Sequence, residues 1–345
     1  MNTDIPVHTE KPPSDSVVYY RLVALWVLCE AMLGGIIHGL KLPVSGLVVG
    51  SCAVICISLI GWYMPQRGAI LRATVIVAIF KMLLSPHAPV TAYIAVFFQG
   101  FLGELLFHRR RYYRLACVTL AVLALLESAT QRILIMTLVY GRDLWVVLND
   151  SIYRLGGSTE TDYSYFIILW YVLLHAIVGV IVGVWTGFLP QRIGLLENLH
   201  QQYHIDPVAA IPAAAERTRK KKSLFRSFFL VLWLLLLMLW LQSALMPSRP
   251  LMPSHLSLRI LIRSAIIILT WYFIAGPLLK KILQNWLQQK KQRSARQVQE
   301  VVDQLPFTRH LLTRSWQLSA GARGLARITL CFRIILANTF HNARA

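Results

Sequence analysis

Residues 163–189 read YSYFIILWYVLLHAIVGVIVGVWTGFL and contain no Asp, Glu, Lys or Arg. A helix needs about 20 largely apolar residues to cross the hydrocarbon core of a bilayer, and this run exceeds that length. Seven further stretches approach it, at 19–40, 44–63, 68–84, 89–107, 115–138, 226–246 and 257–280. The sequence therefore predicts an all-α, polytopic membrane helical bundle of about eight transmembrane helices. The third and fourth spans are short and interrupted, so a single re-entrant unit is an alternative to two separate spans.

Composition supports a membrane protein and argues against a soluble enzyme. The chain has 345 residues, of which 56% are hydrophobic and 14% charged, whereas soluble domains carry about 25% charged residues. Its mean hydropathy is +0.56. The 35 Lys and Arg against 15 Asp and Glu fit nucleic acid, an anionic membrane surface or cytoplasmic loops. The basic residues gather between and after the apolar runs. We therefore expect cytoplasmic loops and contact with an anionic membrane surface, and no nucleic-acid partner.

Loop charges predict one orientation. Cytoplasmic loops retain Lys and Arg, and basic clusters occur at 108–114, at 217–226 and from Lys280 onward. Acidic residues outnumber basic residues in the segment 139–162, and the segment 247–256 contains a single Arg. Both segments are therefore predicted to lie on the outer side of the membrane. Eight spans satisfy these signals with both termini in the cytoplasm. We expect a multi-pass protein of the bacterial cytoplasmic (inner) membrane.

The chain divides into five parts. We expect a disordered cytoplasmic leader at 1–18, a six-helix membrane bundle at 19–190, a basic cytoplasmic linker at 191–225, a two-helix membrane hairpin at 226–282 and a basic cytoplasmic tail at 283–345. Apolar residues recur in the tail at near-helical spacing, from Val298 to Ile335. This pattern is typical of amphipathic helices that lie on a membrane or on a partner.

Polar residues inside the spans are the candidate binding residues. A charge inside a bilayer costs a few kcal/mol, about 3 on insertion scales, so each one is a functional candidate. Topology places several of them in the middle to outer half of the membrane, where they would bind a small polar solute. The candidates are Glu30, His38, Lys81, Gln99, Glu127 and Arg132. The alternative is that Glu30 with Lys81, and Glu127 with Arg132, are structural ion pairs.

Other features have a structural explanation beside a functional one. Glu104 would face Arg109 or Arg110 near the inner surface, and His175 fits a buried core histidine. The series Gly179, Gly183 and Gly187 lets a helix pack closely, either within the bundle or against a partner. We find no catalytic, metal-ligand or cofactor motif, neither a phosphate loop nor His-Glu-x-x-His nor Cys-x-x-Cys, and so expect no enzyme activity and no cofactor.

Two stretches carry a family resemblance. Glu30-Ala31-Met32-Leu33-Gly34-Gly35, and Ser85-Pro86-His87-Ala88-Pro89 with the helix from Ala92 to Glu104, resemble the substrate-binding S component of energy-coupling factor (ECF) transporters. In that family six helices form a pocket open to the outside, the first helix meets a membrane coupling subunit, and two ATPases supply energy. The resemblance implies that Glu30, Lys81 and Glu127 line the pocket. It also implies partner contacts at Ala24 and Ala31.

The chain departs from that family after residue 190. Ser294-Ala295-Arg296 and Ala322-Arg323-Gly324 are similar to short elements through which coupling subunits contact ATPases. This similarity implies partner contacts at Arg296 and Arg323, and anchoring of the tail to anionic lipid is the alternative. We therefore expect a transporter subunit for a small polar, vitamin-like solute, energised by partner ATPases. The alternative is a membrane scaffold or assembly protein whose basic tail recruits protein partners or anionic lipid.

Overall fold

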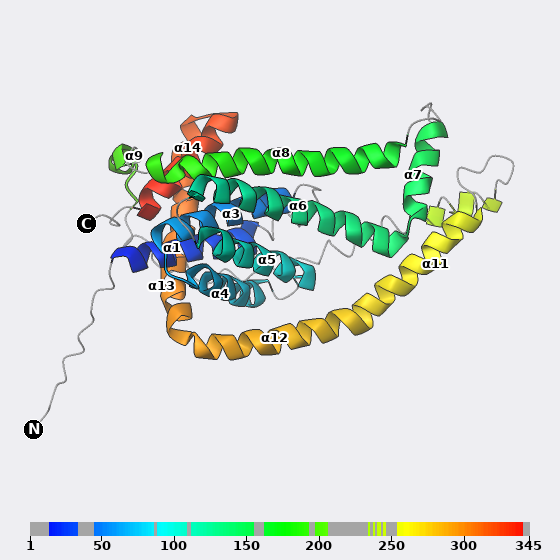
Figure 1. The fold of residues 1–345 in the computed structure, drawn as a ribbon, viewed down its shortest axis with the longest axis horizontal. Helices are drawn as coiled ribbons and strands as arrows, with labels where there is room; N and C mark the ends of the chain where they lie inside the picture. Colours follow the sequence, from blue (N-terminus) through cyan, green and yellow to red (C-terminus); the bar gives the residue numbers. More distant parts are fainter. Residues whose placement is uncertain are drawn as a thin grey trace, which may run out of the picture.

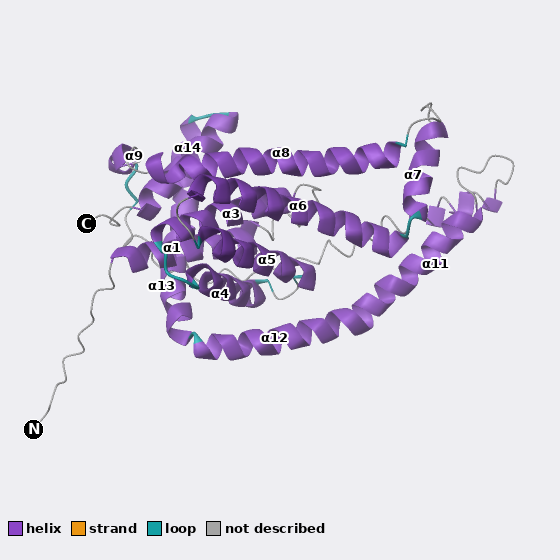
Figure 2. Ribbon diagram, viewed as in Figure 1, coloured by secondary structure: helices purple, strands orange, loops and turns teal. Residues whose placement is uncertain are grey.

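The computed structural model describes residues 14–33, 45–85, 88–108, 112–154, 162–192, 197–205 and 254–340, with scattered positions between 234 and 245. Every regular element in these residues is a helix (Figure 2), which confirms the all-α class. His38, most of the expected leader and linker, and most of the expected span at 226–246 lie outside the described residues.

Six helices pack side by side into a bundle (Figure 1). They are α1 (Ser14–Leu28, continued by the π-helical turn η1, Cys29–Leu33), α3 (Ser45–Tyr63), α4 (Ala69–Leu84), α5 (Val90–Phe107), α6 (Tyr113–Tyr140) and α8 (Tyr163–Arg192). Helix α1 lies inside the bundle, since Leu22 and Trp26 are fully buried. We call the end where α1 and α6 begin the basic end, and the opposite end, where α3 and α5 begin, the distal end.

Five described helices are long and apolar enough to cross a membrane. These segments are Gly46–Tyr63, Val90–Phe107, Tyr113–Tyr140, Tyr163–Arg192 and Leu258–Arg293. Helix α4, in the expected third span, has only 16 residues. It packs beside α5 as a separate helix. The chain is thus a helical protein with several membrane-compatible helices, and the count of eight stays a prediction.

Glycines set the close contact between α6 and α8. A Cβ atom on Gly183 would lie 2.5 Å from the Val118 Cα atom, and one on Gly179 would lie 2.8 Å from the Val122 Cα atom. Only glycine permits backbones to approach so closely. The small-residue series therefore packs within this chain. Both helices extend past α4 and α5 at the distal end, where α7 (Asp143–Arg154) joins them (Figure 1).

One helix runs along the whole bundle. Helices α11 (Ser254–Thr270) and α12 (Gly276–Arg293) are joined by the π-helical turn η5 (Trp271–Ala275) with no non-helical residue between them. This helix contacts α6 and α7 at the distal end, and α4 and α5 nearer the basic end (Figure 1). The boundary expected between 282 and 283 thus falls inside a continuous helix.

The tail forms two helices that pack on the bundle's basic end. Helix α13 (Ala295–Leu318) lies against α1, and after the short turn η6 (Ser319–Gly321) the chain continues as α14 (Gly324–Phe340). Both are amphipathic, because Val301, Leu311 and Ile334 are buried in the same core as α1. Asn338 of α14 ties down the segment after α9 (Glu197–Gln202): its amide accepts from the Ile205 N–H at 3.0 Å and donates to the Tyr203 carbonyl at 3.1 Å.

Candidate functional site

A buried ion pair joins the end of the first helix to α4. Lys81 Nζ lies 2.5 Å from Glu30 Oε2, and the two side chains are only 9% and 4% exposed. Glu30 sits in the π-helical turn η1. Such turns are rare in proteins overall, and many of those that occur lie at functional sites. The Ser85 hydroxyl donates to the Ala31 carbonyl at 3.4 Å beside the pair. The structural pairing of Glu30 with Lys81 considered above is therefore present.

Two further residues of the expected binding set have a buried oxygen without a hydrogen-bond partner in the described part of the chain, as do other bundle side chains such as Trp26 and His175 at a ring nitrogen. Gln99 is 4% exposed and lies beside Gly50 of α3. Its Oε1 atom, and Oε2 of Glu127, are buried without a hydrogen-bond partner among the described residues. A buried polar group that lacks a partner costs roughly 1–3 kcal/mol, so these two oxygens call for an explanation.

Arg132 faces α8. Its side chain lies close to Tyr171 and His175 of that helix. The described residues contain no ion pair between Arg132 and Glu127, so that second expected pair is not formed. A helical turn explains this: residues five apart are separated by about 140° around the helix axis and point to different neighbours. His175 behaves as a core histidine, 1% exposed, with Nδ1 2.8 Å from the Tyr171 carbonyl of its own helix.

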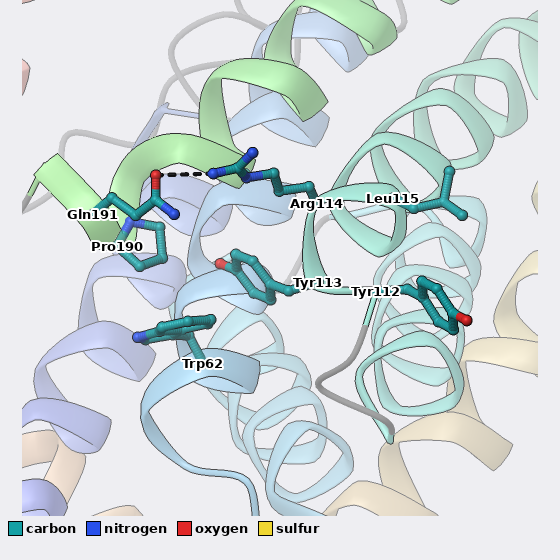
Figure 3. Close-up of a pocket in the computed structure, with 8 residues that line it drawn as sticks. Trp62, Tyr112, Tyr113, Arg114, Leu115, Pro190 and Gln191 are labelled. Carbon is teal, nitrogen blue, oxygen red and sulfur yellow. Dashed lines mark hydrogen bonds between the residues drawn. The ribbon is translucent and has the colours of Figure 1, made fainter.

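These side chains do not line either of two surface pockets of the described residues. One surface pocket lies at the basic end of α3, α6 and α8 (Figure 3), and a second lies along α11. Neither is lined by Glu30, Lys81, Gln99 or Glu127. The Glu30 and Lys81 side chains are buried against each other, so a ligand that binds to either group must displace the other.

The residues expected to face partners fall into two groups. Ala24 is fully buried and Ala31 is 8% exposed, so both are packed inside this chain. Arg296 and Arg323 are exposed, one at the start of α13 and the other just before α14. The two arginines therefore lie near opposite ends of α13.

One structural role was not anticipated. Glu104 caps the start of α4, where its carboxylate accepts from the Gly68 N–H at 2.5 Å and from the Ile70 N–H at 3.2 Å. Gly68 and Glu104 are 36 residues apart in the sequence. No local capping motif therefore predicts this contact. Cys29 lies near Cys52 and Cys56, yet among the described residues no group of His, Cys, Asp or Glu could hold a metal ion.

Comparison with known proteins gave no relative: no protein-family model, no curated protein and no solved structure matches this chain. The similarity to ECF S components therefore rests on the sequence features described above.

Proposed function

We propose that this chain is a membrane transport subunit that binds a small polar solute between η1, α4, α5 and α6. The observation that carries the proposal is the buried Glu30–Lys81 pair, together with the unpartnered oxygens of Gln99 and Glu127 in neighbouring helices. Polar groups inside a membrane bundle are costly and commonly mark substrate pathways.

The ion pair supports a mechanism in which the charges of a bound solute replace the contact between Glu30 and Lys81. A carboxylate and an ammonium that satisfy each other can instead pair with the opposite charges of a zwitterionic ligand, with little net change in charge pairing. Gln99 and Glu127 would then supply a donor and acceptors to the same ligand. The loss of the Glu30–Lys81 bond would free η1 from α4 and open the bundle at its distal end.

No described residue pattern supplies energy for uphill movement. Transport against a gradient would therefore need a partner ATPase or an ion gradient. Arg296 and Arg323, exposed at opposite ends of α13, are the proposed contact points for partner ATPase and coupling subunits.

The test begins with the full chain extracted from its own membrane. Native mass spectrometry would detect a retained solute, and the parent protein would then be titrated with that solute. We expect Glu30→Gln and Lys81→Met each to weaken binding, whereas Lys281→Met, which removes an exposed cation of α12, should bind as the parent does. Unchanged binding in both site variants would overturn the proposal.

A charge swap separates recognition from structure. The double variant Glu30→Lys with Lys81→Glu keeps an ion pair between η1 and α4 but reverses its direction. If the pair only holds helices together, the swap should restore both stability and binding. If the pair recognises a solute, stability should return and binding should stay weak.

A second candidate function is supported by the corner between α13 and α14. Trp316, Leu325 and Ile328 are 50%, 82% and 57% exposed, and the Arg327 guanidinium lies over the Trp316 ring at 4.1 Å. Such a basic and apolar surface suits a scaffold that recruits a protein or anionic lipid. Because Val301 and Leu311 belong to the core, deletion of the tail would disturb the fold. Leu325→Ser with Ile328→Ser tests the surface alone: loss of copurifying partners with unchanged solute binding would favour the scaffold.

A further inference from the structure

A hollow of about 450 Å³ opens at the basic end, between the ends of α3 and α8 and the start of α6. This volume lies within the range of small-ligand sites, roughly 300–1,000 Å³. Its lining residues are Trp62, Tyr112, Tyr113, Arg114, Leu115, Gly187, Pro190 and Gln191. None of them belongs to the polar site described above, and none is acidic, so the arginine gives the hollow a positive charge.

Arg114 is held in a defined position. One guanidinium N–H donates to Gln191 Oε1 at 3.0 Å, as Figure 3 shows, and the guanidinium stacks on the Phe188 ring at 4.3 Å. The guanidinium remains exposed to a ligand, and its planar fork matches two oxygens of a phosphate. Because α8 already restrains the side chain, little further conformational entropy is lost when an anion binds.

The walls are aromatic and amphipathic. The Trp62 and Tyr113 rings meet edge to face with centroids 4.8 Å apart, and the Tyr113 hydroxyl donates to the Ser58 carbonyl at 3.1 Å. Tyr112 and Leu115, 60% and 64% exposed, continue the lining onto the outer surface of α6. Trp and Tyr gather where membrane helices meet the headgroup layer. The hollow thus has a cationic group beside a surface suited to acyl chains.

We propose that this hollow binds the phosphate headgroup of an anionic phospholipid, with Arg114 on the phosphate and the acyl chains along Leu115 and the lipid-facing side of α6. Two observations favour lipid over free phosphate. The hollow lies at the end of two candidate membrane helices, α6 and α8, and its lining continues into exposed apolar residues. The sequence HRRR at 108–111 also predicts that this end faces the cytoplasm, where anionic lipid concentrates.

The chain contains a matched control. Arg314 of α13 is exposed and donates to a glutamine, Gln317 Oε1, at 3.1 Å, as Arg114 does to Gln191. Arg314 does not line the hollow. Arg314→Gln therefore removes the same charge and the same type of hydrogen bond from a different surface.

The experiment titrates the full chain in detergent with phosphatidylglycerol and with phosphatidylcholine, and counts bound lipids by native mass spectrometry. We expect one phosphatidylglycerol to bind more tightly than phosphatidylcholine. Arg114→Gln should weaken it by roughly tenfold or more, the effect of removing a charge-assisted hydrogen-bond donor, and Arg314→Gln should leave it unchanged. Equal loss in both variants, or equal affinity for the two lipids, would overturn the proposal.

Two further arms complete the test. Inorganic phosphate at millimolar concentration should not displace the lipid, and complete displacement would assign the hollow to free phosphate instead. If Arg114→Gln does not fold, the parent protein in vesicles that contain a photoreactive phosphatidylglycerol decides the question. Cross-links on residues 112–115 or 190–191 support the site, and cross-links found only elsewhere refute it.

Discussion

Removal of Lys81 should destabilise the bundle strongly, and removal of both charges should not. At a separation of 2.5 Å and an effective dielectric of about 20, the attraction between Lys81 and Glu30 is on the order of 6–7 kcal/mol. Desolvation of two nearly buried ions offsets most of it. The pair is thus worth little over two apolar residues, yet loss of one partner leaves a buried, uncompensated charge, which costs roughly 3–5 kcal/mol.

A double-mutant cycle measures this directly. Lys81→Met should lower the free energy of unfolding by about 3–5 kcal/mol, and Glu30→Gln should act in the same direction. The double variant should recover most of that loss, because it leaves no unpaired charge. Reversible unfolding in mixed detergent micelles, titrated with SDS, gives the change in the free energy of unfolding for each single variant and for the double variant. Additive losses in the double variant, or a loss below about 1 kcal/mol for Lys81→Met, would show that the two side chains do not interact.

Three other perturbations follow from the packing and the caps. Gly183→Leu should cost at least about 1–3 kcal/mol by overpacking because a side chain there meets the α6 backbone, while Val184→Leu, on the exposed side of α8, should change unfolding little. Glu104→Ala should cost about 1–3 kcal/mol and speed amide exchange at the start of α4, where the carboxylate accepts from three N–H groups; unchanged exchange would contradict the cap. Hydrogen bonds from Asn149 and from the Tyr165 N–H lower the pKa of Asp162 below 3.8, so its contribution to stability is present above that pH and is lost as pH falls through the lowered pKa. The protection factor of the Tyr165 amide, which corrects its exchange rate for the intrinsic effect of pH, should therefore fall in acid in the parent but show no such step in Asp162→Ala.

The helical class and several span positions could be predicted because they depend on local composition. The run at 163–189 lies inside α8, and that at 115–138 lies inside α6, since long apolar segments have no stable alternative to a helix in lipid. The Glu30–Lys81 ion pair, which the sequence offered as an alternative to solute binding, is present; two opposite charges at similar depth in neighbouring spans can satisfy each other.

Features set by rotation and by distant contacts could not be predicted. Arg132 and Glu127 share a helix, but their directions around its axis decide that Arg132 lies close to Tyr171 on α8. The carboxylate of Glu104 caps α4, a contact that only the tertiary arrangement produces, while its expected neighbours Arg109 and Arg110 lie outside the described residues. Similarly, the polar composition after residue 282 suggested a break, but the helix continues to Arg293 because polarity alone does not end a helix.

The uninterrupted helix from Ser254 to Arg293 has a mechanical consequence. At about 1.5 Å per residue it is close to 60 Å long, so a tilt of about 5° at its distal end displaces its other end by about 5 Å. The π-helical turn η5 lies in the middle of this rod, contacts mainly its own helix, and is the kind of irregularity at which helices bend. A rearrangement around α7 would thus be amplified into movement of α13, unless η5 absorbs it by flexing.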